Sequence, residues 1–79
     1  MTPAAKIQEI ITMNASQLTE AIRKAGYKRD RFEESEFLGL THGGEFCFAV
    51  KYFDEDDTLQ QTKVFVRYIS ATGETLVDY

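Results

Sequence analysis

The spacing of apolar residues changes near Phe32, and this change restricts the chain to helices followed by strands. Before Phe32, apolar residues recur every three or four positions, which is the period of one helix face. After it, apolar and polar residues alternate, as in a strand with one buried face. Segregated helices and strands indicate the α+β class. We therefore expect one α+β domain spanning residues 1–79, in which one or two N-terminal helices pack on a three- to four-stranded antiparallel β-meander.

The first expected helix lies within residues 1–12. Pro3 suits the first helical position, because the N–H that proline lacks would have no partner there. Ile7, Ile10 and Ile11 then form one apolar stripe. Two alternatives remain for this segment: a helix that packs on the sheet, or a mobile leader that leaves the folded part of the chain to begin near residue 13.

The second expected helix, residues 13–26, has start and stop signals at both ends. Asn14 is a good N-cap, and Gln17 stands three residues later, where a capping box requires it. Gly26 suits the left-handed position that ends a helix. The apolar stripe between these signals consists of Leu18, Ala21, Ile22 and Ala25.

Strands and turns alternate over residues 36–79. Gly43-Gly44 is typical of a two-residue hairpin turn, since glycine adopts positive φ without a Cβ clash. The polar run from Asp54 to Thr58 and the segment from Ser70 to Gly73 are expected to form the other two connections. Short connections of this kind join neighbouring antiparallel strands, so we expect a meander.

The two central strands have two different faces. Alternation assigns these residues to the core beneath the helices: Phe46, Phe48, Val50, Val64, Val66 and Tyr68. The opposite face holds Cys47, Ala49, Phe53, Phe65 and Ile69 beside Lys51, Lys63 and Arg67. This second face is more apolar than a solvated one normally is, and contiguous apolar surface marks interaction sites. Two alternatives are open: a partner or second copy binds this face, or a helix or the last strand covers it.

Four consecutive acidic residues connect the two central strands: Asp54, Glu55, Asp56 and Asp57. A calcium loop of the EF-hand type would require Gly and Glu where Leu59 and Phe65 stand, so the spacing excludes it. The remaining alternatives are a solvated turn, a surface that steers a partner electrostatically, carboxylates that mimic phosphates in a basic groove, and a catalytic carboxylate pair. The candidate partner-binding residues come from this loop and the face beside it: Phe53, Phe65, Ile69, Asp54, Glu55, Asp56 and Asp57.

The distribution of charge argues against direct binding of nucleic acid. The net charge is −4 at pH 7, and residues 32–79 carry ten acidic and three basic side chains. The basic segment from Arg23 to Phe32 includes two aromatic residues and would suit phosphates and bases. Cations at a helix C-terminus also stabilise the helix dipole, which is a structural reason for the same residues. We therefore expect a larger protein, or a second copy of the chain, as the partner.

Residues that support catalysis are few. The chain has one histidine, His42, and one cysteine, Cys47, and neither stands in a recognisable catalytic pattern. A single cysteine excludes an internal disulfide and a cysteine-based zinc site. Apolar runs are only a few residues long, so we expect no membrane span. These observations predict a cytoplasmic protein with Cys47 reduced, no cofactor or metal, and no enzymatic activity.

In size, acidity and fold class, the chain is similar to the small acidic α+β proteins with which phages and other mobile elements block host enzymes. The uracil-glycosylase inhibitors and several anti-CRISPR proteins are of this kind. The similarity implies an inhibitor that occludes a host defence or nucleic-acid-processing protein, in the host cytoplasm if the chain is phage-encoded. The alternative is a structural or accessory subunit that self-associates, as in a homodimer, through the second sheet face or an edge strand.

Overall fold

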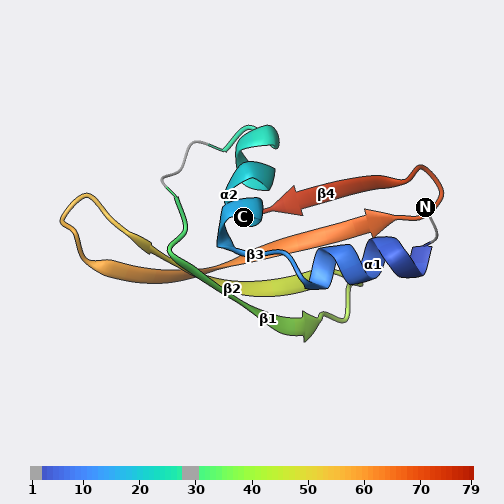
Figure 1. Cartoon of the computed structure of the whole chain (residues 1–79), viewed down its shortest axis with the longest axis horizontal. Helices are drawn as coiled ribbons and strands as arrows, with labels where there is room; N and C mark the ends of the chain where they lie inside the picture. Colours follow the sequence, from blue (N-terminus) through green and yellow to red (C-terminus); the bar gives the residue numbers. More distant parts are fainter. Residues whose placement is uncertain (1–2, 28–30) are drawn as a thin grey trace.

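Two helices precede a four-stranded sheet in the computed structural model, which describes residues 3–27 and 31–79 (Figure 1). The elements are α1 (Pro3–Ile11), α2 (Ala15–Lys24), β1 (Glu34–Leu40), β2 (Phe46–Phe53), β3 (Leu59–Ile69) and β4 (Glu74–Asp78). The strands lie in the order β1-β2-β3-β4, and every neighbouring pair is antiparallel. The expected α+β meander is confirmed, with four strands and two helices.

Both ends of α2 have the predicted caps. The Asn14 side chain accepts a hydrogen bond from the Gln17 backbone N–H, and the Gln17 side chain accepts one from the Asn14 N–H, both at 2.9 Å. At the other end, the Tyr27 N–H donates to the Ile22 carbonyl at 3.0 Å, across Gly26 at φ +98°. This is the hydrogen bond of a Schellman motif, so glycine at this position ends the helix as expected.

The apolar stripe predicted for α1 is only partly buried. The helix begins at Pro3 as expected, but Ile10 is its single buried isoleucine among the described side chains. Ile11 is half-buried, and Ile7 remains 39 % exposed. The helix therefore contacts the rest of the fold mainly through its last turn.

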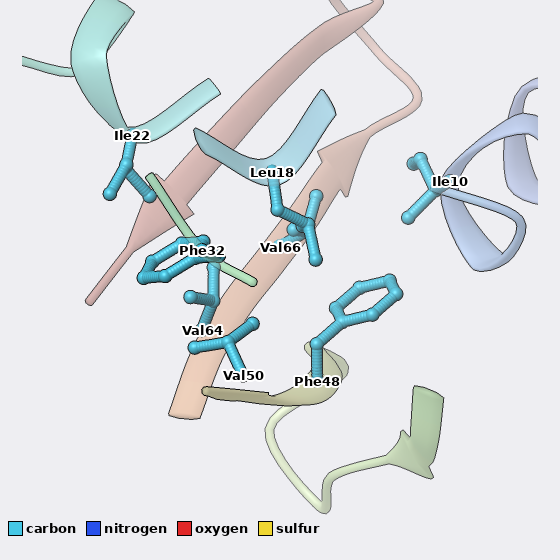
Figure 2. Close-up of a cluster of buried hydrophobic side chains, with 8 residues drawn as sticks. All are labelled: Ile10, Leu18, Ile22, Phe32, Phe48, Val50, Val64 and Val66. Carbon is cyan, nitrogen blue, oxygen red and sulfur yellow. The ribbon is translucent and has the colours of Figure 1, made fainter. Parts of the chain in front are cut away.

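The core lies between the helices and one face of the sheet. Eight buried side chains converge there (Figure 2): Ile10, Leu18, Ile22, Phe32, Phe48, Val50, Val64 and Val66. The strand residues in this cluster belong to the face that alternation assigned to the core, and Phe46 and Tyr68 pack at its margin. The assignment of the two sheet faces is therefore confirmed.

Phe32 and Thr19 form a buried link that the sequence pattern did not indicate. The Thr19 hydroxyl donates to the Ala15 carbonyl at 2.8 Å and accepts from the Phe32 N–H at 3.0 Å. Phe32 lies just before β1, and its ring stacks on Tyr79 with 6.0 Å between ring centroids. The link joins α2 to the segment that enters the sheet.

The turn between β1 and β2 differs from the predicted two-residue turn. The Thr41 N–H donates to the Glu45 carbonyl at 2.8 Å, so three residues, from His42 to Gly44, form the connection. Only the second glycine of the pair has positive φ, at +79° for Gly44. A type I turn followed by a left-handed residue is a common three-residue hairpin connection, and it requires one glycine rather than two.

A β-bulge in β1 brings more apolar surface to the helix side of the sheet. Phe37 pairs with Phe48 and Gly39 pairs with Cys47, so Leu38 is an additional residue between them. The extra residue shifts the alternation, and Leu40 pairs with Phe46 on the core side. Leu40 is nevertheless exposed.

Candidate protein-contact surface

One face of the sheet lies against the helices, and the opposite face contributes no residue to the buried core cluster. We call this second face the open face. It comprises Glu34 and Glu36 of β1, Cys47, Ala49, Lys51 and Phe53 of β2, Leu59, Gln61, Lys63, Phe65, Arg67 and Ile69 of β3, and Glu74, Leu76 and Asp78 of β4. Every residue in the buried core cluster comes from the helices, from Phe32 or from the sheet face that lies against the helices. The open face is therefore available for contact with another molecule.

The centre of the open face is covered by its own side chains. Cys47 and Ala49 are buried, although no helix lies over them. Phe65 is the cross-strand neighbour of Cys47, and Lys63 is the neighbour of Ala49. Long side chains of this kind cover smaller neighbours while their ends remain in solvent. Phe65 is consequently half-buried and exposes less apolar area than the alternation alone suggests.

Exposed apolar area gathers instead at the end of the β2–β3 hairpin. Phe53 and Leu59 are direct cross-strand partners there, and they are 45 % and 50 % exposed. We call these two residues the hairpin-tip pair. The hairpin extends away from the helices at one end of the molecule (Figure 1). Leu59 was not among the predicted site residues, because polar residues follow it and the sequence pattern did not indicate that β3 begins there. Its position directly after the acidic loop was the available signal.

The acidic loop is ordered by one of its own carboxylates. Asp54 accepts hydrogen bonds from the backbone N–H groups of Asp56 and Thr58 and from the Gln60 side-chain amide, each at 2.9 Å. The bonds from Thr58 and Gln60 stabilise the ionised carboxylate and lower the pKa of Asp54 from its usual range. Asp54 therefore has a structural role within the loop.

The other three acidic residues of the loop, Glu55, Asp56 and Asp57, are exposed. The side-chain ion pairs found within residues 3–27 and 31–79 lie elsewhere, on Arg31, Lys51 and Arg67. The negative charge of the loop is therefore not compensated by those cations. It stands directly beside the hairpin-tip pair, because Phe53 precedes the loop and Leu59 follows it.

The predicted site residues do not form a single cluster. Phe53 and the acidic loop lie together at the hairpin tip, whereas Ile69 pairs with Glu74 at the opposite end of β3. Leu59 and Ile69 stand ten positions apart along the extended strand, a distance of about 33 Å. Phe65 lies between the two ends. The hairpin tip is thus the part of the predicted site that can act as one contact surface.

His42 and Cys47, the two residues considered for catalysis, have different environments. His42 is exposed in the β1–β2 turn, and Cys47 is a buried free cysteine of β2. In the described part of the chain, no three histidine, cysteine or carboxylate side chains are grouped so that they could hold a metal ion. Neither helix has the length and apolarity that a membrane crossing requires, as far as the described residues extend.

No family model, no curated protein and no solved structure matches the chain.

Proposed function

We propose that the chain is a non-catalytic module that binds a larger protein and blocks it by steric occlusion. The observation that carries the proposal is the hairpin-tip pair, two large apolar side chains held next to each other in solvent at the end of a projecting hairpin. Buried apolar and aromatic residues supply most of the binding energy of protein interfaces. Phe53 and Leu59 would be such anchors in the complex.

The acidic loop supports a steering role for charge. Uncompensated carboxylates beside an apolar anchor raise the association rate with a basic surface, and their effect decreases with salt. The order that Asp54 imposes on the loop reduces the entropy lost when the loop contacts a partner. Glu55, Asp56 and Asp57 would then form the polar rim around the anchors.

The chain exposes more surface area than a compact monomer of its mass, which is consistent with a binding partner. The chain exposes 5397 Å², whereas a compact monomer of 9.0 kDa exposes about 4,900 Å². The molecule is elongated, with principal extents of 42 × 23 × 19 Å. The extra area is comparable with a large part of one side of a standard interface, which is about 800 Å².

The test is affinity capture of the tagged full chain from cells of its source, with nuclease added, followed by quantitative mass spectrometry. The wild type is compared with the double variant Phe53→Ser/Leu59→Ser. The matched control is Leu40→Ser, because Leu40 is also exposed but lies on the other face of the sheet. We expect one near-stoichiometric partner that the control retains and the double variant loses by about tenfold or more.

Capture of the bait alone, or equal recovery by the double variant, would overturn the proposal. Self-association is the competing function, and sedimentation of the purified chain distinguishes it. A dimer that the double variant dissociates would assign the hairpin-tip pair to a homomeric interface instead.

A further inference from the structure

A groove of about 820 Å³ lies between the two helices and β4, away from the hairpin tip. Figure 1 shows α1 and α2 diverging from their connection, with β4 in the angle between them. Ile10 of α1, Met13 of the connection between the helices and Ala21 of α2 provide apolar walls, and Thr75, Leu76 and Val77 of β4 line the third side. A groove of this volume is within the usual range of ligand-binding sites.

The groove reaches the backbone of an edge strand. β4 is the last strand in the sheet order, so one side of it has no neighbouring strand among the described residues. Three consecutive β4 residues line the groove, although the Leu76 side chain lies on the open face. The backbone of the strand must therefore border the groove. Outward N–H and C=O groups on such an edge are ready to pair with another strand.

One residue that lines the groove has a buried polar atom without a partner. The Thr75 hydroxyl oxygen is buried and forms no hydrogen bond with any described residue. A buried hydroxyl in this state is unfavourable unless a ligand completes its hydrogen bonding. A peptide bound in the groove would satisfy this hydroxyl after rotation of the Thr75 side chain to another χ1 rotamer.

The walls of the groove carry balanced charge in an otherwise acidic molecule. Lys6 and Glu9 stand on the α1 wall, and Glu20 and Lys24 stand on the α2 wall. None of the four takes part in the ion pairs found within residues 3–27 and 31–79. Each wall therefore offers one cation and one anion, which are complementary to a segment that carries both an acidic and a basic side chain.

We propose that this groove binds an extended segment of another protein, which adds to β4 as a fifth strand. The segment has apolar residues at alternate positions, facing Ile10, Met13 and Val77, and mixed charges that pair with the walls. Backbone hydrogen bonds to β4 give this mode its affinity, and the side-chain contacts give its specificity. The site is separate from the hairpin-tip pair and does not depend on the function proposed for that pair.

The experiment selects ligands for the immobilised full chain from a display library of random twelve-residue peptides. The most enriched peptide is synthesised and titrated into the ¹⁵N-labelled chain. We expect enriched sequences to alternate in polarity and the amide signals of Thr75, Leu76 and Val77 to shift. Those of the three amides that point away from β3 should become protected from exchange. Ala25→Trp, which fills one end of the groove, should weaken binding by about tenfold. The control Ala4→Trp, on an exposed part of α1 that does not line the groove, should leave it unchanged.

Three results would overturn the proposal. The first is that the wild-type chain enriches no peptide more strongly than the Ala25→Trp variant does. The second is enriched peptides that shift the signals of Phe53 and Leu59 instead of β4, which would leave the function proposed for the hairpin tip intact. The third is a dimer in solution whose outward-pointing β4 amides are already protected from exchange without peptide. A second copy of the chain would then occupy the groove. The Phe53→Ser/Leu59→Ser variant should bind the peptide as the wild type does.

Discussion

At the scale of single residues, buried polar contacts explain how the segments are joined. The Thr19 hydroxyl both donates and accepts a hydrogen bond, and it is the buried polar side chain of the described core. Its acceptor role matters most, because the Phe32 N–H lies in an apolar environment where an unpaired donor is costly. Thr19 in the buried stripe of α2 therefore has a specific role as a hydrogen-bond acceptor, which the hydrophobic pattern alone does not predict.

Replacement of Thr19 by valine should destabilise the protein by about 1–3 kcal/mol, because the Phe32 N–H loses its acceptor while the volume is conserved. Chemical denaturation of both proteins measures the difference. Thr19→Ser is the control, since it keeps the hydroxyl and loses one methyl group worth about 0.8 kcal/mol. A valine variant as stable as the wild type would show that this hydrogen bond contributes nothing to stability.

At the scale of elements, turn and cap chemistry determine where the helices and strands end. The capping box and the Schellman motif of α2 are local, and both were predictable from residue spacing. The β1–β2 turn was predictable as a turn, but its length was not. Gly43 and Gly44 both permit positive φ, and the hydrogen bond between Thr41 and Glu45 decides which one adopts it.

The two glycines of this turn should therefore respond differently to alanine. Gly44→Ala should destabilise the protein by about 1 kcal/mol through backbone strain at φ +79°, since no atom lies within 4 Å of the added Cβ. Gly43→Ala should have little effect, because the nearest atom, 3.4 Å away, is Oε1 of the flexible Glu45 side chain. Thermal denaturation of the pair tests the three-residue turn. Equal destabilisation by both substitutions would instead favour the two-residue turn.

At the scale of the whole molecule, the two helices are attached with different strength. Leu18, Thr19 and Ile22 bury one side of α2, whereas α1 inserts Ile10 alone. A nine-residue helix is unstable in water without such contacts. The groove between α1, α2 and β4 therefore has one firmly packed wall and one that depends on a single anchor.

Hydrogen exchange should detect this difference. Amides of α1 should exchange much faster than those of α2, because local opening requires the loss of fewer buried contacts. Ile10→Ala should accelerate exchange in α1 further and leave α2 nearly unchanged. Ile7→Ala is the control, since Ile7 is largely outside the core. Equal protection of the two helices would contradict the inference that α1 is held by one anchor.

The order of the elements, the caps of α2 and the buried face of the sheet follow from the amino-acid sequence alone. These features depend on residues a few positions apart, and their spacing is visible in the chain. The exposure of each apolar side chain depends on tertiary packing. Phe65 and Ile69 became half-buried, whereas Leu59 was paired with Phe53 by the register of two strands. Exposure depends on which distant side chains become neighbours, and periodicity carries no information about that.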